Sequence, residues 1–202
     1  MRVQGSIATV DWARESRVTI APHRPSIREL LFFFMSGILI SVPFSLFFEV
    51  IERRFLYGVL PVFYAVFFSV AILTPLIEEF AKAYPLFYRH SETGRSIFKI
   101  GFLIGLGFGI SEFLLYVIVR DTPVLIRLPG MFFHAASTSI TAYGISAKRP
   151  GRYYLIATLL HFLNNFSAFL GPFWFIGGIG ATVAAYSISW RLYHITSDFH
   201  AL

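Results

Sequence analysis

Long apolar stretches, interrupted by short polar segments, fill most of the chain. Six of these stretches have, or nearly have, the ~20 residues that a helix needs to cross the hydrocarbon core of a bilayer. They cover approximately residues 27–51, 60–88, 97–119, 128–146, 153–170 and 172–190. The last two meet at Gly171-Pro172 in a predicted tight turn without charge. The pattern therefore predicts an all-α fold, a polytopic transmembrane helical bundle of about six spans.

Polar segments flank a single predicted membrane domain. Residues 1–26 form a predicted cytoplasmic leader, because charged residues are spread through them and neither the apolar core nor the cleavage site of a signal peptide is present. Residues 27–190 form the transmembrane domain, and residues 191–202 are a predicted cytoplasmic tail. We find no internal repeat and no second domain.

Lys and Arg residues are distributed unequally between the two ends of the predicted spans. Of the 17 Lys and Arg residues, 13 fall on the side of the bundle that holds the N-terminus and four on the opposite side. Short loops with an excess of positive charge stay in the cytoplasm. The bias therefore predicts an integral, multi-pass membrane protein with both termini cytoplasmic.

Composition favours a protein embedded in a lipid bilayer over a soluble one. Hydrophobic residues make up 56% of the chain and charged residues only 14%, whereas a soluble domain has about 25% charged residues. Lys and Arg residues that orient the spans and contact anionic headgroups explain the formal net charge of +6, so no nucleic-acid partner is expected. The absence of cysteine excludes disulfides, thiolate metal sites and a cysteine nucleophile.

Ionisable and amide side chains interrupt the second to fifth predicted spans. Such groups are costly in a membrane and usually face the bundle interior or a water-filled cavity. They are Glu78, Glu79 and Lys82 in the second span, Glu112 in the third, His134 and Thr138 in the fourth, and His161 and Asn165 in the fifth. At ~1.5 Å rise per residue, Glu78, Glu112, His134 and His161 lie roughly 13–21 Å from the cytoplasmic side. Helices can therefore bring them to one level, which favours a joint site.

Taken alone, each residue also has a structural explanation. Glu78 would belong to a solvated charge cluster if its helix ended at Ile77. His134 and Asn165 are also typical of hydrogen bonds between packed helices, and a Thr hydroxyl can bond to its own backbone. The small-xxx-small spacing of a helix-packing face occurs in the third span at Gly101, Gly105 and Gly109.

Carboxylates and neutral imidazoles at one buried site can activate water for hydrolysis. A glutamate in a low-dielectric site can serve as the general base near neutral pH, so Glu78 or Glu79 is a candidate base. Glu78 shares an i,i+4 helix face with Lys82, which favours it over Glu79. The amide of Asn165 can donate to a developing oxyanion.

The same residues leave two alternatives for a cofactor. A zinc ion would find a His₂Glu ligand set in His134, His161 and Glu112, with the glutamate pair supplying the base. In the metal-free alternative the histidines polarise water and substrate directly. Other protease classes lack their residues, since the chain has no Gly-x-Ser-x-Gly motif and no aspartate within a predicted span.

Four short motifs stand in order on consecutive predicted spans. They read Glu78-Glu79-x-x-Lys82, Gly105-x-Gly107-Phe108-x-x-x-Glu112, His134-x-x-x-Thr138 and His161-x-x-x-Asn165. Together they resemble the signature of PrsW-type intramembrane proteases, which are related to CAAX prenyl endopeptidases and bacteriocin-processing proteins. The resemblance implies hydrolysis of membrane-protein or membrane-anchored substrates by water that the glutamate pair activates and the histidines assist. Lys82, Glu112 and Thr138 are expected to support them.

Two positions depart from the related patterns. Phe113 follows Glu112, where the PrsW pattern usually has asparagine, and Ala83 stands where the CAAX-protease pattern has arginine. The second departure favours the PrsW branch. Two other functions are compatible with the same residues: a catalytically silent membrane scaffold of the same superfamily, and a transporter lined by Glu and His. The internal repeats and broken helix pairs typical of transporters are not evident.

Overall fold

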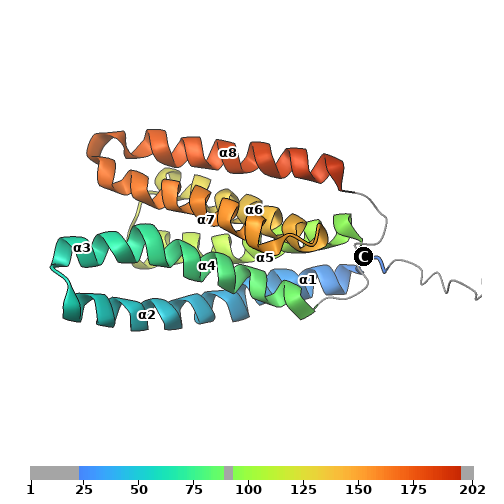
Figure 1. Ribbon diagram of the computed structural model, residues 1–202, viewed down its shortest axis with the longest axis horizontal. Helices are drawn as coiled ribbons and strands as arrows, with labels where there is room; N and C mark the ends of the chain where they lie inside the picture. The colour runs from blue at the N-terminus through green and yellow to red at the C-terminus, as the bar shows by residue number, and fades with distance from the viewer. Residues whose placement is uncertain (1–22, 89–92, 197–202) are drawn as a thin grey trace, which may run out of the picture.

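The computed structural model describes residues 23–88 and 93–196, which form helices and connecting loops without a β-strand (Figure 1). The predicted all-α class is thus confirmed. The chain begins with α1 (Ile27–Ser36), the π-helical turn η2 (Gly37–Ser41) and α2 (Val42–Val59). It returns through α3 (Val62–Phe67), the π-helical turn η3 (Phe68–Leu73), α4 (Thr74–Ala83) and the 3₁₀ turn η4 (Tyr84–Tyr88). The remaining elements are α5 (Gly94–Leu114), the π-helical turn η5 (Leu115–Val119), α6 (Val124–Ser146), α7 (Pro150–Phe166), the 3₁₀ segment η6 (Ser167–Phe173) and α8 (Trp174–Ile195).

Within the described residues, four helical stretches are long and apolar enough to cross a bilayer: Ile27–Val59, Val62–Phe87, Gly94–Val119 and Pro150–Ile195. The predicted number of about six spans is therefore not confirmed. The stretch Pro150–Ile195 contains both α7 and α8. The chain reverses its direction between these two helices at Gly171, whose φ of 58° and ψ of −124° suit glycine (Figure 1). α6 is not among the four stretches, and its run of Ser and Thr residues between His134 and Thr141 makes it less apolar.

Both described ends of the bundle lie at the same end of the molecule, on the right in Figure 1. Ser26 sets the start of α1 with a capping box, since its hydroxyl accepts from the Glu29 amide and the Glu29 carboxylate accepts from the Ser26 amide. α8 continues to Ile195, past the predicted boundary at residue 190. Residues 1–22 of the predicted leader and 197–202 of the predicted tail lie outside the described residues.

The centre of the bundle is α5, which packs closely against α6 through its glycines. A Cβ atom at Gly105 would collide with the carbonyl oxygen of His134, and one at Gly109 with the carbonyl oxygen of Met131. The opposite side of α5 is equally close to α1, because a Cβ at Gly107 would collide with the carbonyl oxygen of Phe34. The predicted glycine face is therefore a backbone-to-backbone contact, and it fixes α6 beside α5 at the level of His134.

A π-helical turn and a proline interrupt the second membrane helix just before its glutamates. Within η3 the backbone N–H groups donate to the carbonyl five residues earlier, as in the bond from the Thr74 amide to the Ser69 carbonyl. The next residue, Pro75, has no N–H, so the Val70 carbonyl that its N–H would have bonded is left for another donor. Asn165 on α7 supplies this donor, since its Nδ2 lies 3.0 Å from the Val70 oxygen. This hydrogen bond connects α7 to η3, the π-helical turn that precedes α4.

Candidate active site

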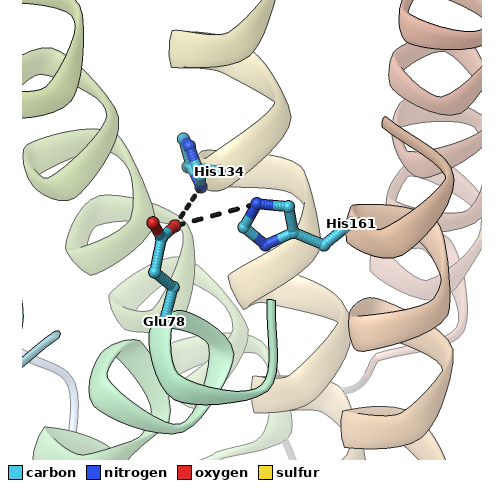
Figure 2. Close-up of side chains that lie close together, drawn as sticks. All are labelled: Glu78, His134 and His161. Carbon is cyan, nitrogen blue, oxygen red and sulfur yellow. Dashed lines mark ion pairs between the residues drawn. The ribbon is translucent and has the colours of Figure 1, made fainter. Parts of the chain in front are cut away.

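Glu78, His134 and His161 meet in the interior of the bundle, each from a different helix (Figure 2). Glu78 lies on α4, His134 on α6 and His161 on α7, and all three are buried. One carboxylate oxygen, Oε2 of Glu78, lies 3.9 Å from Nδ1 of His134 and 3.7 Å from Nε2 of His161. The three groups offer ligand atoms within 4.8 Å of one another. These three residues, which were predicted to lie at a similar depth in the membrane, thus form one cluster of side chains.

In each imidazole ring, the nitrogen that points away from Glu78 contacts a further carboxylate. Nδ1 of His161 lies 2.9 Å from Oε1 of Glu79, and Nε2 of His134 lies 2.7 Å from Oε2 of Glu112. Each imidazole is thereby fixed with its remaining nitrogen toward Glu78. Carboxylate partners of this kind orient metal-ligating histidines and set which nitrogen carries the proton.

The ammonium group of Lys82 lies between α4 and α6, with no exposed surface. Its Nζ is 2.6 Å from Oε1 of Glu79 and 2.9 Å from Nδ1 of His134. Because an ammonium only donates, Nδ1 of His134 accepts and Nε2 donates its proton to Glu112. Although Lys82 shares an i,i+4 helix face with Glu78, its ion pair is with Glu79. The i,i+3 partner Glu79 points between α6 and α7, where the hydroxyl of Ser137 also donates to it at 3.1 Å.

The donor set fits a metal ion, with one change to the predicted ligands. Oε2 of Glu78 is a buried oxygen without a hydrogen-bond partner among the described residues, and it faces two imidazole nitrogens. A cation would satisfy this oxygen, and one glutamate with two histidines is a common zinc set. Glu112, predicted as the third ligand, is not in this group, because its carboxylate bridges the opposite face of His134 and Arg127 at 2.8 Å. The carboxylate of this group is that of Glu78.

A cavity of about 620 Å³ leads to the cluster. Glu78 forms part of its wall, together with Glu112, Asn164 and Asn165, whereas Glu79 does not. Most of the rest of the wall comes from the first two thirds of α2, from the second half of α5, and from η5, the start of α6, η6 and the start of α8. These segments lie away from the end of the bundle where α1 begins and α8 ends (Figure 1). Of the glutamate pair, Glu78 is therefore the member that faces the cavity.

Two predicted site residues make structural bonds. Nδ2 of Asn165 donates to the Val70 carbonyl, so only its second N–H is left for a ligand in the cavity. The hydroxyl of Thr138 donates to the carbonyl of His134, one turn earlier on the same helix, at 2.8 Å. Thr138 thus bonds to the backbone of its own helix, as the structural explanation expected, and this bond stabilises α6 rather than the cluster itself.

Glu49, which was not among the residues predicted for the site, also lines the cavity. Glu49 lies on α2 with a relative exposure of 6%, and its Oε2 is 2.9 Å from Nη2 of Arg53. Its carboxyl is close enough to that of Glu78 for the two to interact. A glutamate inside the first predicted span, followed four residues later by arginine, was the available signal.

Comparison with known proteins adds one match. The family model of PrsW family intramembrane metalloproteases matches residues 25–191, which include every residue of the cluster. No curated protein and no solved structure matches the chain.

Proposed function

Because the chain belongs to the PrsW family of intramembrane metalloproteases, we propose that it hydrolyses peptide bonds of membrane-embedded or membrane-anchored proteins at the Glu78 wall of its cavity. The observation that carries the proposal is the buried Glu78 carboxylate, which faces two imidazoles and also lines the cavity. The family and the four apolar helical stretches make the chain an integral membrane protein. A peptide segment within the bilayer can therefore reach the cavity without leaving the membrane.

Glu78, His134 and His161 would hold the metal of this family, and zinc is the ion that their donor set suits best. When bound, such an ion polarises the scissile carbonyl and makes its water more acidic. Glu79 and Glu112 orient the two imidazoles from behind. Lys82 donates to Nδ1 of His134, the nitrogen that faces Glu78, so this hydrogen bond would have to be given up for the nitrogen to hold a metal.

The proton transfers fall to groups on the cavity wall. Oε1 of Glu78, the carboxylate oxygen that does not face the imidazoles, takes a proton from the attacking water and returns it to the nitrogen of the leaving amine, so that the reaction balances without a further donor. The N–H of Asn165 that does not bond to Val70 can donate to the oxygen of the scissile carbonyl as negative charge develops on it. We place Asn165 in this role because it lines the same cavity as Glu78.

We further propose six membrane crossings with both termini in the cytoplasm. α6, α7 and α8 each cross once in this arrangement, which agrees with the reversal at Gly171 and with the 13 of 17 cationic side chains on one side. The cavity then opens toward the extracytoplasmic half of the bilayer, since η5, η6 and the starts of α6 and α8, which line it, lie away from the end of the bundle where α1 begins and α8 ends. Substrates would be cut in or near that half.

The test is cleavage by purified protein in liposomes that contain a panel of single-span test substrates. Glu78→Gln should lower turnover by at least about 100-fold, because it removes the proton acceptor and a ligand. Glu52→Gln is a matched control, since Glu52 lies on α2 but does not line the cavity. Wild-type turnover by Glu78→Gln would show that the proposal is wrong, and a scaffold or transporter would give no cleavage even with the wild-type protein.

A further inference from the structure

Three arginines line the cavity, and they differ in their partners. Arg53 forms an ion pair with Glu49 at 2.9 Å, and Arg127 forms one with Glu112 at 2.8 Å. Arg120, which is exposed at the end of η5, forms no ion pair within residues 23–88 and 93–196. The wall thus neutralises two of its guanidinium groups and leaves the third available for a negative group from outside.

Tyr116 holds the unneutralised arginine in place. The Arg120 guanidinium lies over the Tyr116 ring at 4.8 Å from its centroid, and Arg127 lies over the same ring at 3.4 Å. Cation–π stacking engages the flat face of a guanidinium and leaves the N–H donors at its edge free. Arg120 therefore presents a pre-oriented fork of donors, which matches the two oxygens of a carboxylate.

The charges deeper in the cavity restrict where an acidic group can bind. Glu49, Glu78 and Glu112 all line the inner wall, so a carboxylate near the cluster would meet like charges. Arg120 directly follows the helical stretch of α5 and η5 and lies eight residues after Glu112, which corresponds to roughly 12 Å along the helix axis. An extended peptide covers that distance in about three or four residues.

We propose that Arg120 binds an acidic side chain of the peptide substrate, three or four residues from the scissile bond on the side toward the cavity mouth. This inference rests on the proposed protease function, and it adds a preference for acidic sequence. Arg120 acts as a specificity residue, because it lies a helix turn or more beyond the cluster and contacts none of its members. The bound group is a peptide carboxylate, and an anionic lipid headgroup is the alternative that the test must separate from it.

The test uses single-span peptides with a poly-leucine span and an otherwise neutral flank that carries one Asp, moved position by position. With wild-type protein, Asp three or four residues from the cut should raise kcat/KM about tenfold over the Asn peptide, mainly through KM, as one charge-assisted hydrogen bond predicts. Arg120→Glu should reverse the preference to a Lys peptide. Arg54→Glu is the matched control, since Arg54 is an exposed arginine of α2 that does not line the cavity, and it should keep the Asp preference.

A second measurement keeps the inference separate from the protease proposal. Fluorescence anisotropy reports binding of the labelled Asp and Asn peptides to Glu78→Gln and to Glu78→Gln combined with Arg120→Glu, in bicelles with and without phosphatidylglycerol. The Asp peptide should bind about tenfold more tightly only where Arg120 is present, in both lipids. Equal binding of Asp and Asn peptides overturns the inference even if cleavage occurs. An Arg120 effect that is the same for all peptides and requires phosphatidylglycerol assigns the residue to lipid and also overturns it.

Discussion

The Glu79 carboxylate and the His161 ring are joined across α4 and α7 by a 2.9 Å contact between Oε1 and Nδ1. This contact turns Nε2 of His161 toward Glu78. The same oxygen of Glu79 also accepts from Lys82 and Ser137. One carboxylate oxygen therefore positions a histidine, a buried cation and a hydroxyl, while the adjacent Glu78 faces the cavity.

Replacing Glu79 should impair the site without removing a ligand. Glu79→Gln keeps the size of the side chain but leaves Lys82 without its charge partner. It also removes the carboxylate that contacts Nδ1 of His161, so the His161 ring loses its fixed orientation. We expect metal affinity to fall by about 10–100-fold, as for other losses of a group that orients a ligand. Isothermal titration with zinc measures this, with Glu52→Gln as a control that should bind like the wild type. Unchanged zinc affinity of Glu79→Gln would contradict the positioning role.

The two possible ligand sets make opposite predictions about bound metal. If Glu78 is the ligand and Glu112 orients His134, then Glu78→Gln should lose stoichiometric zinc, whereas Glu112→Gln should retain it at saturating zinc. Elemental analysis of purified variants reads this directly. Chelation should abolish wild-type cleavage, and added zinc should restore it. Retention of zinc by Glu78→Gln together with its loss in Glu112→Gln would restore the ligand set expected from the sequence.

The contact between α5 and α6 at Gly105 should not tolerate a larger side chain. Gly105→Leu would drive a side chain into the His134 carbonyl and the Thr138 hydroxyl, so the helices must separate. We expect a loss of several kcal/mol, about the size of other overpacking changes, seen as a lower Tm in detergent. Gly180→Ala is the control, because a Cβ at Gly180 on α8 meets nothing within 4 Å. Equal Tm values for the two variants would argue against a tight helix contact at Gly105.

The bond from Asn165 to the Val70 carbonyl predicts coupling between Asn165 and Pro75. Asn165→Leu should cost about 1–3 kcal/mol, because it leaves a buried carbonyl without a donor. Pro75→Ala restores a backbone N–H that can reach this carbonyl. The double variant should therefore be more stable than the sum of the single effects allows, as measured by a double-mutant cycle of unfolding. Additive effects would show that Pro75 and Asn165 do not share the Val70 carbonyl.

Topology can be tested independently of activity. A reporter fused after Leu202 should read as cytoplasmic, and one inserted after Asp121, in the loop between η5 and α6, should read as extracytoplasmic. An extracytoplasmic signal at Leu202 would contradict the six-crossing arrangement. It would also reverse the side on which the cavity opens.

The positions of the helices could be predicted well from the sequence, whereas their rotations could not. Apolar length alone placed a helix at residues 128–146, and α6 covers Val124–Ser146. Depth along each helix, from the constant rise per residue, was enough to expect His134 and His161 at one level. Depth does not tell which side of a helix faces a neighbour. The choice between Glu78 and Glu112 as ligand, and between Glu78 and Glu79 as partner of Lys82, therefore required the structure.

Glu49 shows a second limit. Its position near the end of a predicted span made it indistinguishable from a residue that reaches the headgroups. Only the packing of α2 beside the cavity shows that its carboxylate is buried next to Arg53. The structural bond of Asn165 was equally hidden, since it depends on a π-helical turn in another helix.

The unpartnered oxygen of Glu78 has a consequence for the charge balance of the whole site. Three carboxylates, Glu78, Glu79 and Glu112, share the interior with two cations, Lys82 and Arg127, so one negative charge is in excess when both imidazoles are neutral. In a membrane interior such an excess is costly and attracts a counterion. A bound divalent ion would reverse the sign of this balance, and the site would then attract a carbonyl oxygen that it would otherwise repel. Capture of a cation by these side chains would therefore raise their affinity for substrate.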